Sequence, residues 1–194
     1  GRLRGMGACR VLIFLPQVIA LVVVAIAWRQ IYAPTGTLNQ VLGWLGIDSD
    51  TGWLGEPRLA LIAVGFVGFW LETGLVMLLL LAGMNRIPDE QFEAARLDGA
   101  GPVREFFEII VPAVRAEVAT SLVLTIIAAL KTFDLVYMTT AGGPGTATTV
   151  PSYEVYNRAF ILKDVGSGSA VAVVLAVLVF IINVGVNRIG EERR

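Results

Sequence analysis

The fold of this chain is organised around one charged stretch, Glu93-Ala94-Ala95-Arg96-Leu97-Asp98-Gly99-Ala100-Gly101-Pro102. It belongs to the longest charged segment of an otherwise apolar sequence. Pro88 stands where the first turn of a helix tolerates a missing N–H. Gly99 can adopt the left-handed conformation that ends a helix. The pattern therefore predicts a short amphipathic helix over residues 88–98.

A second short helix is expected directly after the first one. Pro102 opens it and Pro112 closes it, because proline lacks the N–H that a helix interior needs. Its apolar side carries Phe106, Phe107, Ile109 and Ile110. The charged segment thus predicts two short helices at an angle, between two apolar segments of membrane length. The alternative is a solvated loop that happens to be helical, since charge runs are usually solvated faces.

The composition indicates a membrane protein and excludes several kinds of chemistry. Of the 194 residues, 56% are hydrophobic and only 16% are charged, which fits a polytopic membrane protein. A net charge of −1 argues against nucleic acid as a partner. Without histidine and with Cys9 as the single cysteine, the chain cannot build a zinc site or a Ser-His-Asp triad. Neither Lys131 nor Lys163 follows a glycine, so no phosphate-binding loop is present, and no catalytic residue, metal or cofactor is predicted.

Four apolar segments are long enough to cross a bilayer. They cover about residues 11–29, 59–84, 116–137 and 165–187. Pro16 and Gln17 are expected to kink the first one, which would rise about 27 Å as a helix. The predicted fold is therefore all-α, with about four transmembrane helices in a single domain over residues 1–194. The charged loop over residues 86–112 lies between the second and third spans.

Basic residues predict the orientation of these spans. Ten of them lie at the two termini and in the central charged loop, and five lie in or near the other two loops. The terminal ones are Arg2, Arg4, Arg10, Arg188, Arg193 and Arg194. Because cytoplasmic loops carry the excess of Lys and Arg, both termini and the central loop are expected to be cytoplasmic.

Polar residues within the spans are candidates for a transport path. Glu72 lies near the middle of the second span, where a carboxylate needs a partner or water. At 100° per residue, Thr125, Ala129 and Thr132 share one side of the third span with Ser121 and Ala128. We predict Thr125, Ala129 and Thr132 as substrate-path residues, and Glu72 as a further candidate. The alternatives are a structural, protonated or paired glutamate, and hydroxyls that bond back to their own helix and only pack.

The central stretch also resembles a known family. Its order of Glu-Ala-Ala, two residues and Asp-Gly-Ala, followed by Phe, Ile and Pro, is similar to the EAA loop of ABC-importer permeases. Ile87-Pro88 before it resembles the carbohydrate-uptake branch of that family. So does the run from Lys131 to Tyr137 together with Gly142-Gly143-Pro144. The resemblance covers nearly the whole chain.

The resemblance implies a fold, a function and a set of partners. The fold would be that of a type I ABC-importer permease, with a cytoplasmic coupling helix that docks on the ATPase. The residues that carry this coupling would be Glu93, Ala94, Ala95, Asp98 and Gly99. The chain would be the permease subunit of an ATP-driven importer for a sugar or polyol-type solute, in the cytoplasmic (inner) membrane. Its partners would be two ATP-binding subunits, a second permease subunit and an extracytoplasmic solute-binding protein. Family members have more core spans than four, so further spans are expected before Gly1.

The sequence also allows two other classes of function. The first is a permease for a different small solute. The second is a non-transport integral membrane protein, either a scaffold or an intramembrane enzyme built on Glu72 and Asp134. A scaffold has no need of Glu-Ala-Ala and Asp-Gly at that spacing. An acid pair is not expected either, because Glu72 is near mid-membrane and Asp134 near an outer end.

Overall fold

The computed structural model describes residues 6–47 and 49–191, and every regular element within these ranges is helical. The helices are α1 (Met6–Val18), α2 (Leu21–Ile31), α3 (Thr37–Trp44), α4 (Pro57–Met84), α5 (Asp89–Leu97), α6 (Pro102–Glu105), η1 (Phe106–Ile110), α7 (Val111–Ala113), α8 (Arg115–Leu130), α9 (Asp134–Thr139), α10 (Pro151–Tyr156), η2 (Asn157–Ile161) and α11 (Val165–Glu191). Segments η1 and η2 have the wider π-helical winding. The all-α prediction is confirmed. Arg2, Arg4, Arg193 and Arg194, used in the orientation argument, lie outside the described residues.

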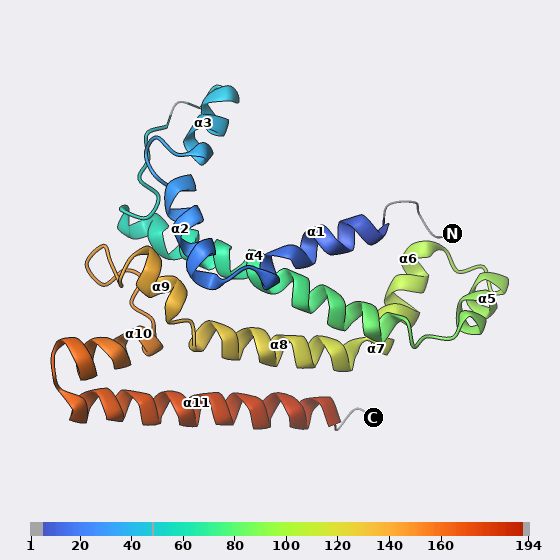
Figure 1. Ribbon diagram of the computed structural model, residues 1–194. Coiled ribbons are helices and arrows are strands. Elements are labelled where there is room, and N and C mark those ends of the chain that lie inside the picture. The colour runs from blue at the N-terminus through green and yellow to red at the C-terminus, as the bar shows by residue number, and fades with distance from the viewer. Residues whose placement is uncertain (1–5, 48, 192–194) are drawn as a thin grey trace.

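Three long helices set the layout of the molecule. Helices α4, α8 and α11 run side by side, with α5 near one end of them and α9 and α10 near the other (Figure 1). By length and composition, α4 and the Val165–Val186 part of α11 could each cross a membrane. Two bent helix pairs, Gly7–Val18 with Leu21–Ile31 and Pro102–Ala113 with Arg115–Leu130, raise the number of candidate spans to four.

The first predicted span, over residues 11–29, is not one straight helix. α1 ends at Val18, and α2 leaves it at an angle of 100°. The bend expected at Pro16 lies slightly later, at Ile19 and Ala20. Ala20 is extended, with φ −57° and ψ 130°, so the helical ladder is interrupted there and restarts in α2. The predicted segment is therefore two helices joined by a sharp bend, because the chain turns to pack α2 against α9.

The third predicted span, over residues 116–137, is interrupted as well. α8 ends at Leu130, and a new helix, α9, starts at Asp134. Between them, the backbone carbonyl of Thr132 accepts a hydrogen bond from the hydroxyl of Ser152 at 2.9 Å. This contact from α10 satisfies a carbonyl outside the helical ladder, as a buried backbone group requires. The apolar segment is thus one helix followed by a separate short one.

The main apolar core lies where α2, α4 and α9 meet. Its most buried side chains are Val24, Ala25, Val64, Val67, Leu135 and Val136. These six are small or medium-sized, whereas Tyr32, directly after α2, is as buried as Val64 and its hydroxyl donates to the carbonyl of Ala63 at 3.2 Å. This core fixes α9 against the middle of α4 and so defines one end of the cavity described below.

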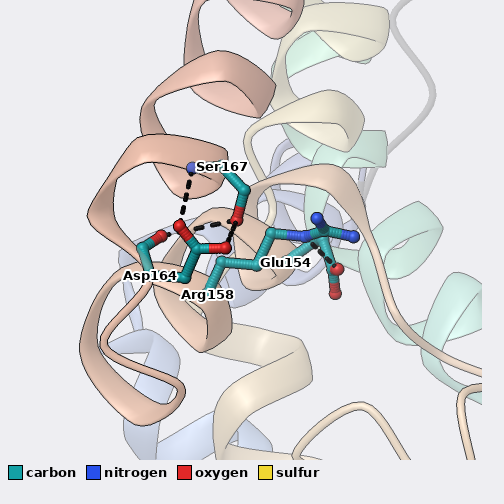
Figure 2. Close-up of polar contacts among 4 residues, drawn as sticks. All are labelled: Glu154, Arg158, Asp164 and Ser167. Carbon is teal, nitrogen blue, oxygen red and sulfur yellow. Dashed lines mark hydrogen bonds and ion pairs between the residues drawn. The ribbon is translucent and has the colours of Figure 1, made fainter.

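Polar side chains fix the turn into α11 (Figure 2). The carboxylate of Asp164 accepts hydrogen bonds from the hydroxyl of Ser167 at 2.7 Å and from its backbone N–H at 3.1 Å. This is the N-cap arrangement, which satisfies one of the free N–H groups at a helix start. These hydrogen bonds, first the hydroxyl and then the backbone one, lower the pKa of Asp164. In the preceding segment, Arg158 pairs with Glu154 at 2.6 Å.

Candidate functional site: a coupling loop and a helix-lined cavity

The short helix α5 ends in the manner that the sequence predicts. Gly99 has φ +79°, the left-handed conformation. The N–H of Ala100 donates to the carbonyl of Ala95 at 2.9 Å, and the N–H of Gly99 donates to that of Arg96 at 3.1 Å. These two bonds form a Schellman motif, which closes a helix and requires the left-handed residue. At the other end, Pro88 is the residue before the helix, with an extended backbone, rather than its first helical residue.

The surface of α5 is open. None of its residues is buried, and Leu97 is 89% exposed. Of the five predicted coupling residues, Glu93, Ala94, Asp98 and Gly99 are exposed and Ala95 is half-buried. A short helix that exposes both charged and apolar side chains has a face available for another chain.

An ion pair that the sequence analysis did not predict joins the two short helices. The guanidinium of Arg96 donates to the carboxylate of Glu105 at 2.8 Å, and only 13% of the Glu105 side chain is exposed. This hydrogen bond, together with the charge of Glu105, raises the pKa of Arg96. The sequence does show one of these charged residues on each helix. Only the angle between the two helices brings the side chains together. The pair holds α5 against α6 within the loop.

The second helix of the loop runs one residue further than predicted. Pro112 does not close it, since helical structure continues to Ala113 and then bends by 64° into α8. The π-helical winding of η1, over Phe106–Ile110, comes directly before Pro112. Because a proline donates no hydrogen bond and crowds the preceding turn, the wider winding accommodates it where a regular α-helix would be broken.

A cavity of about 990 Å³ lies between α4, α8 and α9. All four predicted substrate-path residues line it: Glu72 from α4, Thr125 and Ala129 from α8, and Thr132 from the segment between α8 and α9. The rest of its wall is mainly aliphatic, as is usual for a cavity that holds a small molecule. The sequence predicted that Thr125, Ala129 and Thr132 share one side, and the fold brings Glu72 to the same cavity. Their role as substrate-path residues stays a prediction.

The hydroxyl groups on α8 and directly after it differ in their hydrogen bonds. Thr132 donates to the carbonyl of Ala128 at 2.8 Å, and Ser121 donates to that of Val118 at 2.9 Å. Ser121 is buried and does not line the cavity, so it only packs. Within the described part of the chain, the Thr125 hydroxyl has no hydrogen-bond partner. Thr125 is therefore the α8 hydroxyl most available to a solute.

Two charged residues of the cavity wall were not predicted as site residues. Lys131 and Asp134 line the cavity at the break between α8 and α9, and both are exposed. Phe133, between them, also lines it and stacks on Tyr137 with ring centroids 5.2 Å apart. The ring centroid of Tyr156 lies 5.0 Å from that of Phe133. The run from Lys131 to Tyr137 stood out in the sequence as part of the family resemblance. Its position at the cavity could not be predicted, because it depends on the break between α8 and α9.

Comparisons with known proteins agree with this geometry. The family model for the binding-protein-dependent transport system inner membrane component matches residues 6–191. A probable ABC transporter permease protein of Bacillus subtilis, YurN, is 40% identical over 171 residues, which cover 87% of this chain and 59% of that relative. The trehalose/maltose transport system permease protein MalF of Thermococcus litoralis is 36% identical over 194 residues, which cover 100% of this chain and 65% of that relative.

Solved structures show the same fold. A bacterial ABC transporter involved in the import of alginate matches with a TM-score of 0.85 and 23% identity, over 99% of this chain and 68% of that chain. A bacterial alginate ABC transporter, solved with an alginate pentasaccharide-bound periplasmic protein, matches with a TM-score of 0.84 and 24% identity. The chain spans between 59% and 65% of the length of the two curated relatives above. Because the family model covers residues 6–191, the chain belongs to the family of binding-protein-dependent transport system inner membrane components.

Proposed function

We propose that the full-length protein is the membrane-spanning permease subunit of an ATP-driven ABC importer for a sugar or polyol-type solute. Two ATP-binding subunits, a second permease subunit and an extracytoplasmic solute-binding protein would complete the transporter. The relatives named for trehalose and maltose and the alginate transporters support a carbohydrate as the solute. The subunit itself would perform no covalent chemistry. ATP binding on the partners would shift it between outward-facing and inward-facing states.

One observation carries this proposal: two helices hold both the cavity and the exposed loop. α4 and α8 supply Glu72, Thr125 and Ala129 to the cavity wall, and Thr132 follows directly after α8. The chain between the same two helices forms the loop that contains α5, whose surface is open. A displacement of that loop would move both walls of the cavity. Its coupling residues would be Glu93, Ala94, Ala95, Asp98 and Gly99.

The orientation is part of the proposal. α5 and the last turns of α11 lie toward the same end of the molecule, and α9 and α10 lie toward the other (Figure 1). With the excess of basic residues at the α5 end, both termini and the loop would be cytoplasmic. A reporter that is active only outside the cytoplasm should therefore give a signal when it is inserted at position 145 and none at position 100. The opposite pattern would invert the topology.

Uptake by the reconstituted transporter tests the function. The full-length protein is placed in proteoliposomes with its ATP-binding, permease and solute-binding partners, and labelled disaccharides, polyols and amino acids are offered with ATP or with ADP. We expect uptake of a carbohydrate or polyol that requires ATP. Uptake of an amino acid alone would identify a permease for a different solute, and no ATP-dependent uptake at all would contradict the proposed function.

The loop is tested by one substitution with a matched control. Gly99→Val puts a side chain on a left-handed residue, which costs about 1–2 kcal/mol and deforms the end of α5. Gly101→Val makes the same exchange two residues away, where φ is −82° and a valine fits. We expect Gly99→Val to lose the ATPase in a pull-down and Gly101→Val to retain it. Equal retention would show that the shape of this loop does not determine ATPase binding.

A further inference from the structure

The two ends of the loop are joined by an ion pair at its base. Arg86 is the second residue after α4, and Glu117 lies in the first turn of α8. Nη1 of Arg86 lies 3.2 Å from Oε1 of Glu117. The arginine side chain is 79% exposed, whereas the glutamate side chain is only 15% exposed. The carboxylate is therefore held inside the junction between the helices, and the guanidinium covers it from the surface.

A glycine makes room for this carboxylate. Gly83 is buried in the last turn of α4, and a Cβ there would lie 2.7 Å from Cδ and 2.9 Å from Cγ of Glu117. Real Cβ atoms do not come so close to another atom. Any residue other than glycine at position 83 would therefore displace the end of the Glu117 side chain. Because that end is flexible, the displacement would change the position of the carboxylate rather than the path of either helix.

The second carboxylate oxygen is available for another contact. Oε2 of Glu117 is buried and has no hydrogen-bond partner within the described part of the chain. The residues leading into and out of the loop enclose a cavity of about 360 Å³ beside it, lined by Arg86, Gln91 and Glu117 among others. Such a cavity has room for ordered water. Loss of Arg86 would leave both oxygens of a largely buried carboxylate without a protein partner, which is strongly unfavourable.

We propose that Gly83, Arg86 and Glu117 form a clasp that makes the loop-side ends of α4 and α8 move as one body. The inference rests on the proposed transport function and adds three positioning residues to it. Without the clasp, a displaced loop could move one helix and leave the other behind. With it, the two walls that carry Glu72 and Thr125 follow the loop together. None of its three residues lines the cavity that contains Glu72 and Thr125.

The ratio of ATP hydrolysed to solute imported tests the clasp in the reconstituted full-length transporter. Glu117→Gln keeps the shape and removes the charge, Arg86→Gln removes the partner, and Gly83→Ala displaces the carboxylate without changing any charge. We expect each variant to retain its partners and to raise the ratio at least about threefold. The double variant of Arg86→Gln and Glu117→Gln should be no worse than the worse single one, because both remove the same interaction.

A second arginine–glutamate ion pair, formed between residues four positions apart, is the control. Glu154 and Arg158 lie on α10 and η2, away from the loop. Arg158→Gln should leave the ratio at the parent value. The clasp is overturned if Arg86→Gln and Glu117→Gln keep the parent ratio, if their effects simply add, or if Arg158→Gln raises the ratio equally. If Gly83→Ala fails to assemble, Arg86→Gln and Glu117→Gln still test whether the clasp exists. A parent transporter without ATP-dependent uptake would instead overturn the proposed function, and the clasp with it.

Discussion

Helices α4 and α11 are nearly equal in length, at 28 and 27 residues, and both are apolar enough to cross a membrane. They differ in how the rest of the chain covers them. In the most apolar part of α4, 22% of the residues are buried, whereas none is buried in that of α11. α4 packs against α1, α8 and α9, but α11 has contacts with α8, α10 and η2. Hydropathy alone therefore identifies helices that can cross a membrane, but not the helix that carries the site.

Glycine and polar residues account for the difference. Gly74 of α4 is so close to α1 that a Cβ would lie 2.8 Å from the carbonyl oxygen of Ile13. Gly83 admits the side chain of Glu117, and Glu72 lines the cavity. In α11, a Cβ at Gly185 would have no described atom within 4 Å. The start of α11 does approach another segment, since a Cβ at Gly168 would lie 3.1 Å from Cβ and N of Ala159. The approaches below 3 Å described for these two helices, at Gly74 and Gly83, are both on α4, where small residues permit close packing.

The largest effect is expected from filling the cavity. Ala129→Leu adds three carbon atoms to the wall between Thr125 and Thr132, so the solute can no longer occupy its place. We expect uptake to fall by about a hundredfold or more, as for other misplacements of a bound substrate, with normal assembly. Val177→Leu on the exposed surface of α11 is the control and should transport normally. Normal uptake by Ala129→Leu would show that the α8 surface only packs.

The next effect is on stability. Gly74→Ala places a methyl group against the backbone of α1, which has no flexible end to move aside. Overpacking of this kind should lower the free energy of unfolding by about 1–3 kcal/mol. Gly185→Ala in α11 should be neutral or stabilising, by up to about 1 kcal/mol. Thermal unfolding of the detergent-solubilised protein measures both, and equal stability of the two variants would remove the distinction between the helices.

A smaller effect should separate the two threonines of the cavity. The Thr132 hydroxyl already donates to Ala128, whereas the Thr125 hydroxyl has no partner within the described residues. One lost hydrogen bond to the solute corresponds to about 0.5–1.5 kcal/mol, or about a twofold to tenfold rise in KM. We expect that rise for Thr125→Val and a smaller one for Thr132→Val. Ser169→Ala on α11 should leave KM unchanged, and equal effects of the two threonine variants would contradict the assignment.

The smallest effect concerns the start of α11. The hydrogen bonds from Ser167 lower the pKa of Asp164 in the folded protein below its ordinary value of about 3.9. The stabilisation is therefore fully present above that value and is lost as the pH falls through the lowered pKa. Asp164→Asn keeps a good N-cap but cannot titrate. We expect its melting temperature to fall less than that of the parent below about pH 4. Parallel curves for the two proteins would show that this carboxylate contributes nothing.

Local features of the fold could be predicted from the sequence. The helix over residues 88–98 is found as Asp89–Leu97, and Gly99 has the left-handed conformation that was predicted for it. Thr125 and Ala129 line one cavity because helical spacing places them on one side of α8, and Thr132, just after the helix, lines it as well. These features depend on residues within a turn or two of one another, so the sequence contains the necessary signal.

Features that depend on distant contacts could not be predicted. The 100° bend after α1 turns α2 toward α9, where Val24 and Ala25 pack against Leu135 and Val136. Pro16 predicts a kink in this region, but neither the size of the bend nor its position at Ile19 and Ala20. The clasp joins residues that are 31 positions apart, and its carboxylate needs the space that Gly83 leaves in the last turn of α4. Such contacts are set by the way in which the helices cross.

One measurement tests the central claim most directly: whether the α8 wall at Ala129 faces water while α11 faces lipid. In the full-length protein, the native cysteines, including the exposed Cys9, are replaced. Ala129→Cys or Val177→Cys is then treated with a membrane-impermeant maleimide in the assembled transporter, with and without ATP. Only a thiol that reaches water forms the reactive thiolate. The account predicts that Ala129→Cys reacts in at least one nucleotide state, that transported solute slows this reaction, and that Val177→Cys stays unreactive. Equally slow labelling of both positions in every state would contradict it.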